Sequence, residues 1–223
     1  MKTYDQFIRE GVYDPNIFKA VFMAGGPGSG KSFVAGKTTG GLGLKMINSD
    51  TPFERFLKKE GLSLKMPEAE TEKRDVERAR AKKVTASKKF HAVKGRLGIL
   101  IDGTGHVYDK VVKQAGMLQQ IGYETSMVFV NTSLEVALAR NEQRARSVMP
   151  KLVKKSWQDV QNNMGKFQNF FGPKSFFIVD NNGVEQDMLE ISTKLIRRAI
   201  SSPVNNKIAN AWIANEMKKK DRS

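Results

Sequence analysis

The segment Gly25-Gly26-Pro27-Gly28-Ser29-Gly30-Lys31-Ser32 constrains the fold more than any other part of the chain. It fits the pattern G-x-x-x-x-G-K-[ST], in which glycines let the backbone turn with positive φ and approach a polyphosphate closely. An apolar run over residues 18–24 precedes the segment, and residues 32–37 can begin a helix. A strand, a glycine-rich turn and a helix N-terminus in this order predict a loop that binds phosphate through its backbone N–H groups.

Within this pattern each side chain has an expected task. Lys31 would reach the β- and γ-phosphates of a nucleoside triphosphate, and Ser32 would hold the Mg²⁺ that bridges them. The alternative, a glycine-rich turn with a chance lysine, is disfavoured by the flanking strand and helix. The residues predicted to bind the nucleotide are Gly25, Gly26, Gly28, Ser29, Gly30, Lys31, Ser32 and Phe33.

Four further apolar runs, over residues 44–48, 97–102, 125–131 and 175–180, alternate with stretches that have helical periodicity. This alternation predicts an α/β fold of the three-layer P-loop NTPase type, with a five-stranded parallel sheet covered by helices on both faces. We expect an N-terminal extension over 1–17 with a short helix at 4–10, a P-loop domain over 18–202 with a basic helical insertion at 55–96, and a C-terminal helix and basic tail over 203–223.

The charge of the chain is strongly positive, with 38 Lys and Arg against 23 Asp and Glu and a net charge of +15. Between residues 55 and 96 there are 14 basic and 6 acidic residues. Such an excess favours polyanionic partners, so we expect a nucleic acid or nucleotide-type substrate. Residues 68–94 mix both signs and predict a helical insertion, either one long helix or a hairpin.

Two bulk features bear on location. The chain has no cysteine, which excludes disulfides and thiolate metal sites and is compatible with a reducing compartment. Neither a signal-peptide core nor an apolar run of membrane-spanning length is present. We therefore expect a cytoplasmic protein without a membrane partner, whereas the sequence does not indicate an oligomeric state.

Two carboxylates follow predicted strands at the edge that carries the phosphate loop. Asp50, after the second strand, could orient an attacking hydroxyl and take its proton, or it could cap the helix that starts near Pro52. Asp102 ends the third strand in the Walker B manner and could orient Mg²⁺, or belong to a simple turn. Thr104, two residues further, could contact the substrate.

Arginines gather where the helix over residues 134–144 ends. Arg140 and Arg144 are four residues apart and so share one helical face. They could clamp the transferring phosphoryl group and neutralise its charge in the transition state. The alternative is favourable positive charge at a helix C-terminus.

These motifs together resemble the P-loop kinases grouped around phage polynucleotide 5′-hydroxyl kinase and the zeta-toxin type of small-molecule kinase. The segment 47–50 (Ile-Asn-Ser-Asp) is similar to the polynucleotide kinase segment with the general base, and 140–144 followed by Met149-Pro150 is similar to its lid. The resemblance therefore implies a lid over residues 138–150. The resemblance covers about residues 18–180 and suggests a phage-encoded member. One departure is Phe53, because that kinase has a phosphate-binding arginine at this position; the nearest arginine here is Arg55.

The sequence and the resemblance therefore predict an ATP- and Mg²⁺-dependent kinase. Lys31, Asp50, Arg140 and Arg144 are the expected catalytic residues, Ser32 and Asp102 the metal ligands, and Arg55 and Thr104 the candidate substrate contacts. The acceptor would be a hydroxyl of a nucleic acid, a nucleotide or a related metabolite. Two alternatives are a zeta-toxin-like kinase of nucleotide-sugars, which would arrest growth of a host if it acts as a toxin, and a nucleotide-dependent switch protein without an acceptor.

Overall fold

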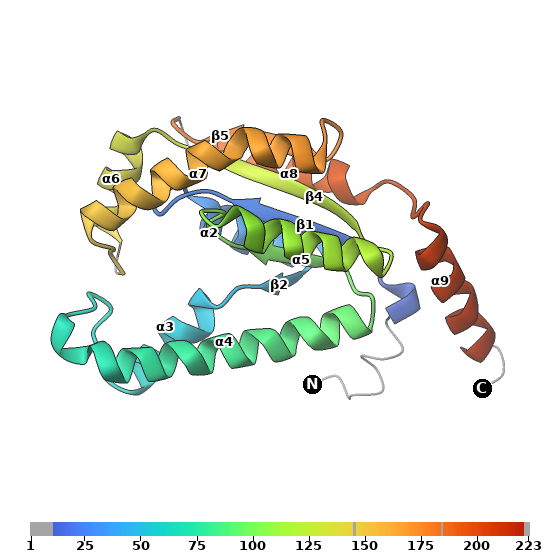
Figure 1. Cartoon of the computed structure of the whole chain (residues 1–223), viewed down its shortest axis with the longest axis horizontal. Coiled ribbons are helices and arrows are strands. Elements are labelled where there is room, and N and C mark those ends of the chain that lie inside the picture. The colour runs from blue at the N-terminus through green and yellow to red at the C-terminus, as the bar shows by residue number, and fades with distance from the viewer. Residues whose placement is uncertain (1–10, 145, 184, 221–223) are drawn as a thin grey trace.

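A computed structural model describes residues 11–144, 146–183 and 185–220, so the helix expected at 4–10 lies outside the described residues. Five parallel strands form one sheet in the order β2-β3-β1-β4-β5 (Figure 1). The fold class predicted from the sequence is confirmed. The strands are β1 (Lys19–Ala24), β2 (Lys45–Ile47), β3 (Ile99–Asp102), β4 (Glu124–Asn131) and β5 (Phe176–Asp180).

Strand β1 lies in the middle of the sheet, and all six of its residues are buried. Its side chains alternate between two cores, as the period of a strand requires. Phe22 packs into a core with α5 (Tyr108–Gln120) and α7 (Pro150–Phe171), whereas Val21 and Met23 pack into a core with α2 (Lys31–Leu42) and α8 (Glu185–Ile200). Helices therefore cover both faces, which explains why β1 is apolar throughout.

The register of the parallel strands positions the site. Met23 pairs with Asp102, so the end of β1, which leads into the phosphate loop, lies beside the end of β3. Ligands of open parallel sheets bind at this edge because the loops after the strands diverge there.

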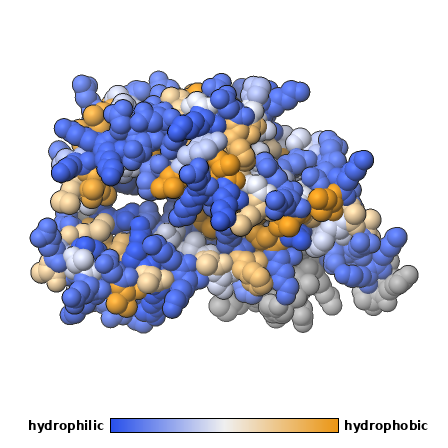
Figure 2. All heavy atoms as spheres, viewed as in Figure 1, coloured by the Kyte–Doolittle hydropathy of each residue, from blue (hydrophilic) through white to orange (hydrophobic). Residues whose placement is uncertain are grey.

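The basic insertion forms a helical unit with a small core of its own. Helix α3 (Asp50–Lys59), the short η2 (Glu68–Glu70) and α4 (Thr71–Lys94) follow one another, and α4 is one continuous helix rather than a hairpin. Phe53, Phe56, Leu57 and Ala81 join α3 to α4 in a cluster separate from the two cores of the sheet. In Figure 1 this unit lies across from α6 (Leu134–Gln143), and Figure 2 shows a hollow between the two.

The C-terminal segment expected over 203–223 contains helix α9 (Lys207–Lys220). The Asn206 side chain precedes this helix and accepts hydrogen bonds from the N–H groups of Ile208 and Ala209. The helix packs beside the 3₁₀ helix η1 (Gly11–Tyr13), at the opposite end of the molecule from α6 (Figure 1). Among the described helices, none combines the length and the apolar composition needed to cross a membrane.

Candidate active site

The phosphate loop is held in place by residues that lie just after three of the strands. The carbonyl oxygen of Ser29 accepts hydrogen bonds from Asn181 Nδ2 at 2.6 Å and from Thr132 Oγ1 at 3.4 Å, and Gly25 N donates to the Thr104 carbonyl at 3.0 Å. These partners follow β5, β4 and β3, respectively. Neither Asn181 nor Thr132 belongs to a sequence motif, so only the fold reveals their part in shaping the loop.

Polar groups of the loop are available for a ligand. Ser29 is 3% exposed, yet its Oγ makes no hydrogen bond within the described part of the chain. A buried hydroxyl without a partner is costly, so such groups call for a ligand or another explanation. Together with the N-terminus of α2, this unsatisfied donor fits a bound phosphate.

Gly28 is the loop residue least able to accept a side chain. Its φ is +81°, and an added Cβ would lie 2.1 Å from the Ala137 carbonyl oxygen. Gly28→Ala is therefore expected to lower the free energy of unfolding by about 1–3 kcal/mol and to weaken nucleotide binding, measured by urea denaturation and by titration with a fluorescent ATP analogue. Gly36→Ala is the control, since an added Cβ there meets nothing within 4 Å. A Gly28→Ala protein as stable as the Gly36→Ala protein would contradict this prediction.

Lys31, Ser32 and Asp102 meet at the start of α2. The ammonium of Lys31 lies 3.1 Å from Asp102 Oδ1, and Ser32 Oγ donates to Asp102 Oδ2 at 3.4 Å. Asn48 Nδ2 also donates to Asp102 Oδ2. The Asp102 side chain is only 1% exposed, and the Lys31 ammonium and these two donors surround it.

This cluster also fits a Mg²⁺ site. Mg²⁺ binds oxygen ligands and usually keeps water and substrate phosphates in its coordination shell, so one protein hydroxyl and one carboxylate can suffice. Ser32 and Asp102 supply such a pair. Among the described residues, no three His, Cys, Asp or Glu side chains gather to form a metal site of protein ligands alone.

Asp50 lies in the first turn of α3, with Ser49 at the N-cap position, so its carboxylate does not cap the helix. Instead it accepts a hydrogen bond from Arg78 Nη1 at 2.7 Å and pairs with Arg146 Nη2 at 3.0 Å. Burial alone would raise the pKa of Asp50. The charge of Arg146, the hydrogen bond and charge of Arg78, and the charge of Lys31 outweigh burial and hold this pKa below its ordinary value of 3.8.

Arg146 reaches Asp50 because Asn141 shapes the loop after α6. Asn141, 2% exposed, donates through Nδ2 to the Val148 carbonyl at 2.7 Å and accepts from Val148 N at 3.0 Å. Arg146 also pairs through Nε with Glu54 at 2.9 Å. The sequence shows three arginines close together, Arg140, Arg144 and Arg146. Their helical spacing favoured Arg140 and Arg144 as the functional pair, so Arg146 was not predicted. Arg78 lies in a long charged helix without a motif and could not be singled out.

The two arginines predicted from the sequence occupy different environments. Arg140 Nη1 donates to the Asn181 carbonyl at 2.9 Å, and the Asn181 amide in turn contacts Ser29 in the phosphate loop. Arg140 is thus linked to the phosphate loop through Asn181. Arg144 is exposed, and its carbonyl accepts a hydrogen bond from Lys65 Nζ at 3.3 Å. The catalytic roles of both arginines stay predictions.

The remaining predicted residues divide between the site and its surroundings. Gly26 faces the backbone of Trp157, and Gly30 forms the left-handed start of α2. The Phe33 side chain is partly buried against the core that α2 and α8 form with the sheet, and its predicted contact with the nucleotide stays a prediction. The guanidinium of Arg55 lies 5.4 Å from the Phe56 ring, and Arg55 is not among the residues around the pocket described next.

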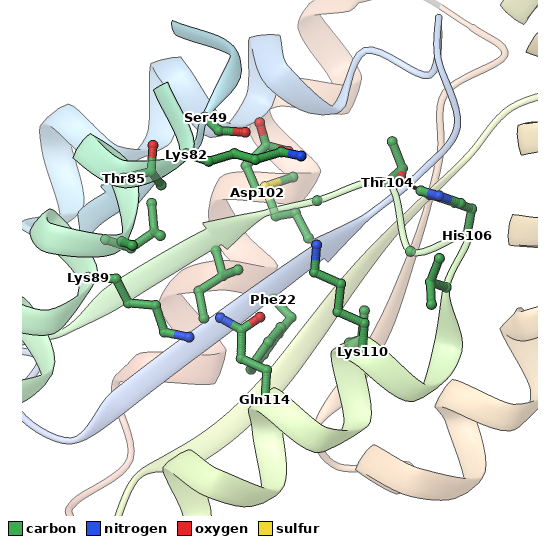
Figure 3. Close-up of a pocket in the computed structure, with 18 residues that line it drawn as sticks. Phe22, Ser49, Lys82, Thr85, Lys89, Asp102, Thr104, His106, Lys110 and Gln114 are labelled. Carbon is green, nitrogen blue, oxygen red and sulfur yellow. Dashed lines mark hydrogen bonds between the residues drawn. The ribbon is translucent and has the colours of Figure 1, made fainter. Parts of the chain in front are cut away.

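A pocket of about 440 Å³ opens beside Asp102 (Figure 3). Phe22, Ile47 and Ile101 form an apolar floor, and α4 and α5 form the two walls. Ser49, Asp102 and Thr104 lie at the end nearest the phosphate loop, where Thr104 Oγ1 hydrogen-bonds with His106 Nδ1. The size of this cavity lies in the range of small-molecule sites, and it combines an apolar floor with polar side chains from the walls and the end.

A parallel sheet of this strand order, a phosphate loop after β1 and a carboxylate after β3 define a P-loop kinase, a class of phosphotransferase. The family model for zeta toxin matches residues 13–187, so the chain belongs to the zeta toxin family. No curated protein sequence matches the chain.

Two solved structures share the fold. The chain is similar to a protein described as a kinase from Chloroflexus aurantiacus, with 13% identity and a TM-score of 0.54 over 82% of this chain and 96% of that one. It is also similar to a chain of the AvrRxo1-ORF1:-ORF2 complex with ATP, with 13% identity and a TM-score of 0.56 over 79% of this chain and 62% of that one. At this level of identity the likeness concerns the fold alone.

Proposed function

We propose that the protein transfers the γ-phosphoryl group of ATP to a hydroxyl of a nucleotide or nucleotide-type metabolite, with Mg²⁺ as cofactor. The single observation that carries the proposal is the short series of contacts that joins Asp50 to the phosphate loop: Asp50 N donates to Asn48 Oδ1, Asn48 Nδ2 donates to Asp102 Oδ2, and Asp102 Oδ1 pairs with Lys31. A carboxylate at this edge of the sheet can position an attacking hydroxyl in line with the phosphoryl group. ATP as the donor is supported by membership of the zeta toxin family and by the ATP in the structure of AvrRxo1-ORF1:-ORF2, which shares the fold.

In this mechanism each group of residues has a separate role. Backbone N–H groups of the loop and the Lys31 ammonium bind the phosphates, while Ser32 and Asp102 would hold Mg²⁺, which neutralises charge on the phosphate oxygens. Asp50 accepts a hydrogen bond from the acceptor hydroxyl and takes its proton. Because the pKa of Asp50 is low, proton transfer occurs late, after the bond to phosphorus has largely formed, as a loose transition state allows.

Arginines supply the remaining charge compensation. Arg146 lies against Asp50, and Arg140 lies next to the residue that supports the phosphate loop. Positive charge placed where negative charge develops lowers the barrier without a covalent step. The residues therefore act mainly through alignment and charge neutralisation.

Incubation with γ-³²P-labelled ATP and a panel of acceptors tests the proposal. The panel contains nucleosides, nucleotides, nucleotide-sugars, and DNA and RNA with free 5′-hydroxyl ends. We expect label on a nucleotide-type small molecule. Slow ATP hydrolysis without any labelled acceptor would instead favour a nucleotide-dependent switch.

The net charge of +15 favours a second candidate, a nucleic-acid acceptor. Binding to a nucleic acid that neutralises several phosphates falls steeply with salt, by about 10³–10⁵ between 50 and 200 mM for six to ten contacts. A kinase of a small metabolite is expected to show a much shallower dependence of KM on salt. A steep dependence with DNA or RNA as the labelled acceptor would replace the metabolite by a polynucleotide.

The environment of Asp50 also predicts a pH effect. The ionised carboxylate stabilises the folded chain above its ordinary pKa, and this contribution is lost as the pH falls through the lowered pKa. Arg146→Gln removes the strongest charge that lowers the pKa of Asp50, so we expect the acid limb of kcat/KM against pH to move to higher pH. The same shift should appear in an NMR titration of the Asp50 carboxyl carbon.

Arg80→Gln is the matched control for this measurement. Arg80 belongs to α4 and pairs with Glu77 rather than with Asp50. Its replacement should leave the titration of Asp50 where it was. A titration that is unchanged in Arg146→Gln as well would remove Arg146 from the environment of the base.

A further inference from the structure

The outer face of α4 carries a stripe of exposed side chains that the proposed mechanism does not use. Positions three or four apart on a helix share one face, and six such positions of α4 are all exposed: Val76, Arg80, Lys83, Ser87, Phe90 and Lys94. We call these six residues the outer stripe. Helix α4 runs along the lower margin of the molecule in Figure 1, with the sheet above it.

The outer stripe faces away from the active site. Ala81 and Ala92 are buried and lie on the opposite face of α4, where they pack against α3 and the core of the sheet. Thr85 belongs to that inner face as well, since its hydroxyl donates to the Asn48 carbonyl at 3.2 Å. None of the six stripe residues lines the pocket beside Asp102. A ligand of the stripe would therefore leave the pocket open.

The charge of α4 changes along its length. Its acidic residues, Glu72, Asp75 and Glu77, all lie in the first two turns, whereas residues 78–101 contain eight Lys and Arg and no Asp or Glu. The helix dipole favours basic residues only in the last turn, so it does not account for Lys83 in the middle of the helix. The second half of α4 is thus a purely basic surface.

The cations of the outer stripe have few partners. Within the described residues, Arg80 pairs with Glu77 at 3.5 Å, and neither Lys83 nor Lys94 forms an ion pair. A helix face that is merely solvated usually mixes both signs, because pairs of opposite charge three or four residues apart stabilise it. The stripe lacks this balance and fits a polyanion.

Phe90 is an exposed aromatic ring in the middle of this charge. Its side chain is 63% exposed and belongs to none of the three apolar clusters of the described residues. The neighbouring His91 ring lies edge-on at 5.5 Å between ring centroids. Lys94 follows Phe90 by about one helical turn, and Lys83 precedes it by about two. An open ring face therefore lies between two cations.

We propose that the outer stripe binds single-stranded nucleic acid, with phosphates on Lys83 and Lys94 and a base stacked on Phe90. Cations that follow the backbone and aromatic rings that stack on bases are the two elements of sequence-independent binding to single strands. The strand is a docking partner and not the phosphoryl acceptor, because the stripe and the pocket lie on different faces of α4. The inference goes beyond the proposed function and does not depend on it.

The arrangement of the stripe favours a single strand over two other polyanions. In a duplex the bases stack on one another, so that Phe90 would find no base face to contact. A membrane-surface helix requires a broad apolar face. The stripe has only Val76 and Phe90, which are about 21 Å apart along the helix axis at 1.5 Å per residue.

Fluorescence anisotropy of labelled oligonucleotides with the full chain tests the partner. The probes are DNA and RNA strands of mixed sequence, the duplex of the same DNA sequence, and vesicles of anionic phospholipid measured by co-sedimentation. We expect both single strands to bind more tightly than the duplex. No binding of either strand, tighter binding of the duplex, or binding of the vesicles alone would overturn the inference.

The double variant Lys83→Gln/Lys94→Gln tests the contribution of charge. Each phosphate contact to a single strand contributes about 0.7 to the slope of log K against log salt concentration, so the slope should become shallower by about 1.4. Lys194→Gln/Lys207→Gln is the matched control, because it removes two exposed lysines on α8 and α9. Equal slopes in the two double variants would show that binding depends on overall charge and not on the stripe.

Two substitutions of Phe90 test the stacking contact. Phe90→Leu keeps an apolar side chain but removes the ring, so affinity for the single strands should fall about fivefold or more. Phe90→Trp keeps a ring and should bind as the wild type does. Because Phe90 is exposed, both variants are expected to fold, which circular dichroism checks. Unchanged binding by Phe90→Leu would exclude stacking on this ring.

Phosphoryl transfer separates this inference from the proposed function. With labelled ATP and a small acceptor, the Lys83→Gln/Lys94→Gln protein should transfer at the wild-type rate. If transfer persists and no strand binds, the docking inference fails and the kinase proposal stands. If strands bind and no acceptor is labelled, the proposed function fails alone. Label on the oligonucleotide itself, lost in the double variant, would make the strand the acceptor and overturn the docking role.

Discussion

Replacing Lys31 with alanine is expected to reduce phosphoryl transfer by at least ~10³-fold, the scale associated with losing a charge that stabilises the transition state. The ammonium of Lys31 lies at the start of α2 and pairs with Asp102 at 3.1 Å. In the proposed mechanism this ammonium binds the phosphates of ATP during the transfer. Assay with labelled ATP and the acceptor found in the panel measures the effect.

The same substitution also leaves Asp102 without its cationic partner. Asn48 and Ser32 still donate to Asp102, so we expect the fold to be retained with some loss of stability. Circular dichroism and urea denaturation check this separately from activity. Lys83→Ala, an exposed lysine on α4 outside the pocket, is the control for removing positive charge. Transfer at the wild-type rate by a folded Lys31→Ala protein would exclude the phosphate loop from the mechanism.

Asp50→Asn is expected to slow transfer by ~10²-fold or more, the usual contribution of a positioned general base. Asparagine keeps the shape of the side chain but accepts no proton at neutral pH. Because Asp50 is proposed to contact the acceptor hydroxyl and is not one of the residues that bind the phosphates, the affinity for the ATP analogue should change little. Single-turnover kinetics together with titration of the analogue distinguishes a loss of chemistry from a loss of binding.

Glu54→Gln provides a comparison for this variant. Glu54 pairs with the same arginine, Arg146, but lies one helical turn further along α3. If disturbing Arg146 accounts for the loss, both variants should be slowed alike. If Asp50 accepts the proton, Asp50→Asn should be slowed far more. Equal rates in the two variants would show that Asp50 acts only as a partner for arginine.

The sequence predicted the parts of the site that are formed by one continuous segment or by residues at the ends of strands. Gly25 to Ser32 form one continuous segment, and Asp50 and Asp102 follow strands whose carboxyl ends meet by parallel pairing. The five strands and their direction could be read in the same way, because strands and helices alternate along the chain. Roles assigned to these residues stay predictions, although their positions at one edge of the sheet follow from the fold.

What the sequence did not indicate are contacts between distant segments. Arg78 reaches Asp50 over 28 positions of the chain, and Asn181 reaches Ser29 over 152 positions. Lys82 and Lys89 on α4 and Lys110 on α5 line the same pocket. No periodicity in the sequence indicates that these two helices face each other there. For Arg146 the decisive interaction is that of Asn141 with the Val148 backbone, which turns the loop toward α3. Such contacts depend on tertiary packing and leave no local pattern.

The separate apolar cluster between α3 and α4 has a consequence for how ATP is protected from water. Lys31 is anchored to the sheet, whereas Asp50 belongs to a unit held together by Phe53, Phe56 and Leu57. A unit with its own core can shift as a whole while the sheet stays still. A shift of this kind would separate Asp50 from the phosphate loop while the loop kept its shape, so ATP could stay bound with no base in place to activate water.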